Sequence, residues 1–110
     1  MNNTTVKEGK NMAIIAYLTI FGVIIAFSMN VDKKNDFASF HIRQSLGLWL
    51  LFLFISAFIG YFDSIAISAA FYLVFIVLWI YGFSGALAER KQQIPLVGSL
   101  FQSMFASIIK

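Results

Sequence analysis

Hydrophobic residues in this chain form long uninterrupted runs and do not alternate with polar ones. Residues 12–29 and residues 65–88 carry no charge, and a third apolar stretch over residues 37–62 has polar side chains mainly at its start. A helix that crosses a bilayer needs about 20 predominantly apolar residues. The pattern therefore predicts three membrane-spanning helices, with residues 46–61 as the spanning part of the second.

The last segment, residues 94–109, has a weaker helical pattern. Pro95 suits the first turn of a helix, where a missing amide costs nothing. Apolar side chains then recur at three- and four-residue spacing, at Val97, Leu100, Phe101, Met104, Phe105 and Ile108. The other face is small and lacks the Lys and Arg typical of helices that lie in the membrane plane. We expect a short or tilted fourth span, with an interfacial helix as the alternative.

These elements predict an all-α, polytopic membrane protein, a four-helix transmembrane bundle whose fourth helix is short or interfacial. Residues 1–11 are expected to form a polar N-terminal tail, and residues 12–110 a single membrane domain. A cleaved signal peptide is the alternative reading of the first apolar run, and the length of the run favours a retained helix. Asn35 or Asp36 is expected to cap the second helix. Asp63 or Ser64 is expected to cap the third.

Composition narrows the class of protein further. Of the 110 residues, 60% are hydrophobic and 12% are charged, a balance outside that of water-soluble domains. The net charge of +3 comes from scattered residues, which argues against nucleic-acid binding. The absence of cysteine excludes disulfides, Cys-based zinc sites and a thiol nucleophile.

Charge also suggests an orientation. If four helices alternate across the bilayer, Lys and Arg of the loops at residues 30–36 and 89–93, together with Arg43, share one side. The cations of the two termini then share the other side. Because cytoplasmic loops carry an excess of Lys and Arg, we expect the two charged loops to be cytoplasmic, in the cell inner membrane.

The polar start of the second helix is the sharpest candidate site. His41, Arg43 and Gln44 stand in an apolar segment, where ionisable groups are costly and often functional. They are expected to anchor the helix at lipid headgroups, and the alternative is that they line a polar vestibule or contact a partner subunit. Lys33 and Lys34 in the preceding loop are further headgroup candidates. A single histidine without cysteine or a carboxylate cluster predicts no metal site.

Small residues four positions apart predict faces where helices approach closely. Such pairs serve either packing within the chain, which we favour, or oligomer formation. They are Gly22 with Ala26, Ser56 with Gly60, and Gly82 with Ala86.

Four stretches carry a resemblance to a known family. They are residues 35–48 (Asn-Asp-Phe-Ala-Ser-Phe-His-Ile-Arg-Gln-Ser-Leu-Gly-Leu), residues 16–18 with Gly22, residues 79–87 (Trp-Ile-Tyr-Gly-Phe-Ser-Gly-Ala-Leu), and residues 94–98 (Ile-Pro-Leu-Val-Gly). From about residue 12 onward the chain resembles the Tic-twenty-like family, which joins a chloroplast inner-envelope protein-import component to small bacterial proteins. The resemblance implies four membrane helices and a place in an inner-membrane translocon.

We therefore expect a non-enzymatic subunit of an inner-membrane assembly concerned with protein translocation or insertion. The alternative is a small oligomeric pore or transporter for ions or small solutes. The chain shows no set of nucleophile, base and orienting group and no phosphate-binding loop, so neither an enzyme nor a cofactor is predicted. The expected partners are the lipid bilayer, other membrane-protein subunits and further copies of the chain.

Overall fold

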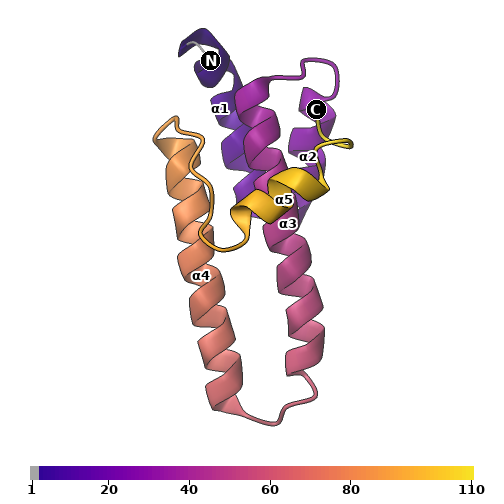
Figure 1. The fold of residues 1–110 in the computed structure, drawn as a ribbon, viewed down its shortest axis with the longest axis vertical. Helices are drawn as coiled ribbons and strands as arrows, with labels where there is room; N and C mark the ends of the chain where they lie inside the picture. Colours follow the sequence, from indigo (N-terminus) through magenta and orange to yellow (C-terminus); the bar gives the residue numbers. More distant parts are fainter. Residues whose placement is uncertain (1–2) are drawn as a thin grey trace.

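A computed structural model describes residues 3–110 of the chain, and its regular elements are all α-helices, as predicted. In chain order they are α1 (Asn3–Leu18), α2 (Ile20–Asn30), α3 (Asp36–Ile59), α4 (Ile65–Leu87) and α5 (Gly98–Met104). The two long helices α3 and α4 run antiparallel, and the other three gather around one end of this pair (Figure 1). The molecule is elongated, with principal extents of 48, 24 and 21 Å.

The first apolar run is not one helix, which corrects the expected span over residues 12–29. The chain turns back at Thr19, whose extended backbone separates α1 from α2 and whose hydroxyl accepts a hydrogen bond from the Gly22 amide at 3.1 Å. Gly22 lies so close to α1 that a Cβ there would be 2.0 Å from the carbonyl oxygen of Ile15. Glycine therefore permits a hairpin of two adjacent helices where the pattern of hydrophobic residues suggested one long helix.

The N-terminal segment also differs from the expected polar tail, because α1 already includes residues 3–11. This part of α1 packs against the start of α3. Asn35 donates its side-chain amide to the Thr5 carbonyl at 2.9 Å, and a Cβ at Gly9 would be 2.1 Å from the Asn35 side-chain oxygen. The polar start of α1 is thus fastened to the rest of the fold.

The two long helices agree with their predicted positions and caps. Asn35 is the N-cap of α3, and its side-chain oxygen accepts from the Ala38 amide at 3.0 Å. Ser64 is the N-cap of α4, and its hydroxyl accepts from the Ile67 amide at 3.3 Å. Both helices are long and apolar enough to cross a membrane; at about 35 Å each, they match or exceed its hydrocarbon thickness.

The C-terminal segment does not form a helix long enough to span. Helix α5 has seven residues, which corresponds to about 10 Å, and it begins three residues after Pro95, which lies in a turn. It crosses α3 at Gly47, where a Cβ would be 2.2 Å from the ring of Phe101. The short or tilted span expected over residues 94–109 is therefore reduced to a seven-residue helix that packs across α3.

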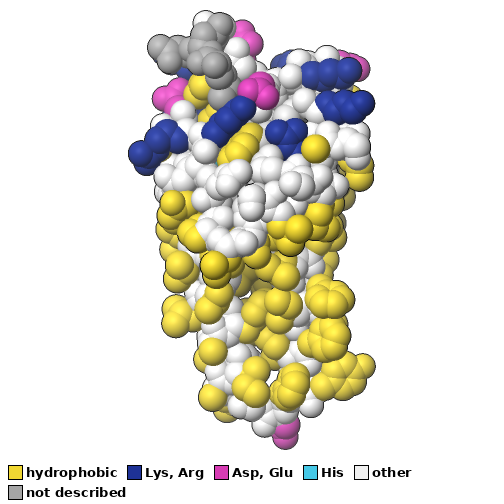
Figure 2. All heavy atoms as spheres, viewed as in Figure 1, with side chains coloured by type: hydrophobic (Ala, Val, Ile, Leu, Met, Phe, Trp, Pro, Cys, Tyr) yellow, Lys and Arg dark blue, Asp and Glu magenta, His cyan; other side chains and the backbone are white. Residues whose placement is uncertain are grey.

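Burial divides the molecule into two parts. We divide the chain into a head and a stem. The stem is residues 49–78, and the head is the rest of the described chain: α1, α2, α5, residues 36–48 of α3, residues 79–87 of α4, the loops joining them and residues 105–110. Nearly all buried side chains lie in the head. The stem holds only α3, α4 and their connecting turn, and yellow hydrophobic side chains cover its visible face (Figure 2).

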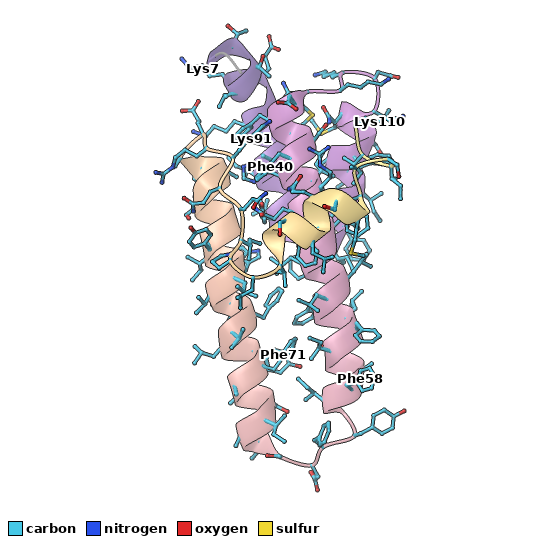
Figure 3. All side chains as sticks on the ribbon, viewed as in Figure 1. Lys7, Phe40, Phe58, Phe71, Lys91 and Lys110 are labelled. Carbon is cyan, nitrogen blue, oxygen red and sulfur yellow. The ribbon has the colours of Figure 1, made fainter. Side chains whose placement is uncertain are left out.

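Aromatic rings fill the space between the two helices of the stem. Phe52 of α3 contacts Phe71 and Phe75 of α4 at ring-centroid distances of 6.2 and 4.6 Å, and Trp49 lies 5.5 Å from Phe75. Such offset and tilted ring pairs are mutually stabilising. Phe58 and Phe71, labelled in Figure 3, lie far from the head residues Phe40 and Lys91.

Candidate functional site: a buried polar network in the head

The polar residues at the start of α3 point into the head. Ser39, His41, Gln44 and Ser45 are each 0% exposed. Burial of polar groups is costly unless they are hydrogen-bonded, so each side chain needs partners within the fold. Ser45 donates to the Ile42 carbonyl of its own helix at 3.1 Å, and the partners of the other three come from α1, α2 and the segment after α4.

Gln44 is the centre of the network and makes three hydrogen bonds. Its amide nitrogen donates to the Tyr17 hydroxyl at 2.9 Å and to the Gln92 carbonyl at 3.0 Å. Its side-chain oxygen accepts from the Ile94 amide at 2.7 Å. One side chain of α3 thus holds both α1 and the irregular segment that connects α4 to α5.

His41 makes the second set of contacts, and these indicate which ring nitrogen of its neutral form carries the hydrogen. Its Nε2 lies 2.8 Å from the carbonyl oxygen of Arg90, which can only accept, so Nε2 carries a hydrogen. In the neutral imidazole Nδ1 is then an acceptor, and the Tyr17 hydroxyl donates to it at 2.7 Å. Tyr17 therefore donates to His41 and accepts from Gln44, which gives the three side chains one consistent arrangement.

The Arg90 carbonyl is presented by the turn that ends α4. The Arg90 amide donates to the Gly85 carbonyl at 2.8 Å and the Glu89 amide to the Ala86 carbonyl at 3.3 Å. These two hydrogen bonds form the pattern of a Schellman cap. Glu89 occupies the left-handed position of the cap, with φ of 60°, although glycine is the usual residue there.

Helix α4 meets the network through small residues and one tryptophan. A Cβ at Gly82 would be 2.9 Å from the Tyr17 ring, and one at Gly85 would be 2.7 Å from the Gln92 side chain. Trp79 donates its indole N–H to the Tyr17 carbonyl at 2.6 Å. That bond satisfies one of the carbonyls left without a helical partner where α1 ends.

A second group of polar contacts holds the loop between α2 and α3. Asn30 donates to the Ser39 hydroxyl at 2.9 Å and accepts from the Asn35 amide at 2.8 Å. Because Asn35 also caps α3 and bonds to α1, these few side chains connect three helices. Asn30 and Asn35 are 4% and 9% exposed, so this group belongs to the interior of the head.

Arg43 fastens the C-terminal segment. Its Nε donates to the Gln102 side-chain oxygen at 2.7 Å, and its Nη1 donates to the Ile109 carbonyl at 2.6 Å. Gln102 in turn donates to the Phe40 carbonyl at 2.9 Å. The guanidinium is thus engaged by α5 and the residues after it, so two of its donors bond within the chain.

The surface of the head is basic. All eight Lys and Arg residues of the chain belong to the head or its loops, whereas Asp63 lies at the far tip of the stem. Figure 2 shows blue side chains only at the head end and a magenta side chain at the tip. The expected division of cations between two ends is therefore corrected. An ion pair joins Lys91 to Asp36 on this surface, with both side chains partly exposed.

The structure separates the predicted contact residues into two sets. His41 and Gln44 are buried and meet in one network, so neither faces a headgroup or a partner. Arg43 lies on another side of α3, and Lys33 and Lys34 are exposed in the loop after α2.

Sequence reasoning did not predict five residues of the network: Tyr17, Asn30, Trp79, Gln92 and Gln102. Tyr17 and Trp79 lie in stretches that carry the family resemblance, and Gln102 is a polar residue within an apolar segment, whereas Asn30 and Gln92 lie in polar loops and gave no signal.

The predicted small-residue pairs also fall into two sets. Gly22 and Ala26 in α2 and Gly82 and Ala86 in α4 are all buried in the head. Ser56 and Gly60 lie in the stem, where Gly60 is exposed and a Cβ there meets nothing closer than 3.5 Å. The first two pairs therefore admit neighbouring elements of the same chain. In the third pair Gly60 has no close neighbour, and the Ser56 hydroxyl is buried without a hydrogen-bond partner among the described residues.

The hydrogen bonds of the network hold neighbouring segments of the head together. Both ring nitrogens of His41 are hydrogen-bonded within the head, so the imidazole has no free nitrogen for a metal or a substrate proton. Over residues 3–110, no three His, Cys, Asp or Glu side chains gather in a way that could hold a metal ion. What the arrangement does is hold two short helices and an irregular segment on the first half of α3.

The fold and the network together define an all-helical protein with two candidate membrane-spanning helices and a polar-fastened, basic head. Comparison of the chain with protein-family models, with curated proteins and with solved structures finds no match.

Proposed function

We propose that this chain is a non-enzymatic integral membrane protein and a subunit of an inner-membrane assembly. The observation that carries the proposal is the bare surface of α4, where 6% of the most apolar 18-residue stretch is buried, against 33% in α3. A core helix of a soluble protein would be mostly covered. Exposed apolar surface on this scale requires lipid or other membrane helices around it.

In this proposal α3 and α4 cross the bilayer, and the hairpin of α1 and α2 enters it from one side without crossing. Helix α2 has 11 residues, about 16 Å, roughly half the hydrocarbon thickness. The basic head lies at the cytoplasmic surface, because cytoplasmic segments are enriched in Lys and Arg. Both described ends of the chain, together with the loops at residues 30–36 and 89–93, are then cytoplasmic, and the tip at Asp63 faces the other side.

Thiol labelling tests this topology directly, because the natural chain has no cysteine. We expect a membrane-impermeant maleimide to label Asp63→Cys in intact cells. Lys10→Cys and Lys33→Cys should react only after the inner membrane is opened. Labelling of Lys10→Cys but not of Lys33→Cys in intact cells would mean that residues 12–29 cross the membrane, and it would refute the half-inserted hairpin.

Membership of an assembly is supported by the uncovered side of α4 and by the resemblance to the Tic-twenty-like family. The translocation or insertion activity rests on the resemblance alone. Site-specific photo-crosslinking tests the first point. Val77 is 57% exposed on α4, whereas the ring of Phe75 faces α3 within the stem.

A photoreactive residue at Val77 should therefore crosslink to a neighbouring membrane protein, and the same residue at Phe75 should not, which makes Phe75 a matched control. Purification in mild detergent, followed by mass measurement and identification of co-purifying chains, should then return translocon or insertase subunits. Recovery of the chain alone, with no crosslink at Val77, would contradict the proposal.

The alternative of an oligomeric ion or solute pore has less support. No Asp, Glu, Lys, Arg or His occurs in α3 beyond Arg43 or anywhere in α4, so neither face of the stem offers the charged side chains that mark intramembrane ion pathways. Aromatic rings occupy the space between α3 and α4. A non-conducting membrane subunit fits these features better.

A further inference from the structure

The helices are unevenly distributed along the long axis of the molecule, with more of them at the head end than along the stem. In α3, the buried residues run from Phe37 to Leu48, with only Ile59 beyond them. In α4, only Gly82, Gly85 and Ala86 near the other terminus of that helix are buried. Since α3 and α4 are antiparallel, both patterns mark the same end of the molecule. Helices α1, α2 and α5 pack there and leave the stem bare (Figure 1).

The added helices stop near the middle of the long pair. Trp79, which bonds to the last turn of α1, lies about 12 Å from the end of α4. Gly47, which contacts Phe101 of α5, lies about 16 Å from the start of α3. Each distance is close to half of the roughly 30 Å hydrocarbon core.

From this geometry we infer that the chain, free of assembly partners, is a molecular wedge that favours curved bilayers, with its head in the expanded leaflet. The inference rests on the membrane insertion proposed above. Five helices occupy one leaflet and two occupy the other, so the protein takes more area on the head side. A leaflet on the convex side of a curved membrane offers that extra area, whereas a flat bilayer must deform to supply it, as it does for a mismatch in length.

The network described above keeps the wedge rigid. Tyr17 binds α1 to α3, Arg43 binds the C-terminal segment to α3, and Asn35 binds the start of α1 to the α2–α3 loop. Without these bonds the short helices could spread at the surface and lose their fixed width. A curved membrane can favour one orientation of the protein only if the two orientations differ in free energy. A head of fixed width provides that difference, because it fits the convex leaflet better than the concave one.

The test is the orientation of the protein in vesicles of two sizes, made only of phosphatidylcholine. With the same lipid in both leaflets and no lipid net charge, the basic head contributes little to the choice between them. Two variants report orientation: Lys110→Cys at the head and Asp63→Cys at the tip. Both positions are exposed, and an impermeant maleimide added outside labels only the end that faces outward.

We expect the ratio of outward to inward heads to rise roughly threefold or more from large extruded to small sonicated vesicles. Lys110→Cys labelling should increase and Asp63→Cys labelling should decrease in parallel. An unchanged ratio in protein that floats with the vesicles and resists alkaline extraction would overturn the wedge alone. Protein removed by alkaline extraction would overturn the membrane insertion on which the wedge rests.

A second copy of the chain filling the space beside the stem would also remove the wedge shape. Gly60→Cys, at an exposed position of the stem, tests this in the same vesicles at low protein density. Absence of disulfide-linked dimers under mild oxidation is the expected result. Efficient dimer formation at this position, with no change of orientation with vesicle size, would overturn the inference in favour of a paired stem.

Discussion

Replacing Gln44 with methionine isolates the contribution of the polar network to stability. The two side chains have similar volume, so Gln44→Met leaves little cavity or overpacking. The change removes all three hydrogen bonds of the glutamine amide. Tyr17 keeps its bond to His41, but the Gln92 carbonyl and the Ile94 amide lose the partner that Gln44 provided.

The expected loss follows from those two backbone groups. A buried donor or acceptor left without a partner costs about 1–3 kcal/mol. Two such groups predict roughly 2–6 kcal/mol. Hydrogen bonds in membrane proteins tend toward the lower values, because unfolded segments in lipid also find polar partners. We therefore expect Gln44→Met to lower the free energy of unfolding by roughly 2–3 kcal/mol.

The assay is reversible unfolding in mixed micelles of a mild detergent and sodium dodecyl sulfate, followed by tryptophan fluorescence. Of the two tryptophans, Trp79 lies within the head and bonds to the Tyr17 carbonyl, so its share of the emission reports on the affected contacts. Gln93→Met is the matched control. Gln93 is exposed, and its replacement should change stability by no more than about 0.5 kcal/mol.

A loss below about 1 kcal/mol for Gln44→Met, or an equal loss for Gln93→Met, would refute this reasoning. It would mean that water or other groups satisfy the Gln92 and Ile94 backbone when the glutamine is absent. The head would then be held mainly by apolar packing, and the network would be a consequence of the fold with little influence on its stability.

Three further substitutions test other parts of the structure, each by the same unfolding measurement. Gly22→Ala should destabilise the protein by about 1–2 kcal/mol, because the clash with the α1 backbone outweighs the gain in helix propensity. Its control, Gly60→Ala, places a methyl group where no atom is close and should be neutral or slightly stabilising. Equal effects of the two changes would contradict the tight hairpin. Glu89→Gly should stabilise by about 1 kcal/mol by relieving the left-handed backbone; destabilisation would argue against that backbone conformation. Lys91→Met should cost less than about 1 kcal/mol, because its ion pair with Asp36 is partly exposed; a larger loss would show that the pair is shielded from solvent.

Local sequence signals predicted the long helices well. Charged or polar turns flank α3 and α4, and the capping residues Asn35 and Ser64 stand immediately before them. The turn at Thr19 had no such signal, because neither threonine nor glycine interrupts an apolar run as strongly as a charge or a proline does. It depends on the close contact of Gly22 with α1 and on the bond from Trp79. Trp79 lies far along the chain, beyond the reach of a local pattern.

The sequence predicted the central side chains of the candidate site, and it did not predict the groups that bond to them. His41, Arg43 and Gln44 stand out because polar side chains in an apolar helix need an explanation. Their acceptors are largely backbone carbonyls, at Arg90, Gln92 and Ile109, and a carbonyl has no signature in a sequence. The sequence therefore indicated which side chains matter, and it left open whether they face lipid, a partner or the interior.

The position of the polar network explains why the head needs it and the stem does not. Within a bilayer, apolar packing gives helices little drive to associate, because lipid tails are as apolar as leucine. Long helices stay in place by spanning, and α3 and α4 meet this requirement by length. Short helices such as α2 and α5 cannot be held in this way. Direct hydrogen bonds to α3 provide the missing attachment, so we expect the head to come apart first and α3 and α4 to remain helical within the membrane.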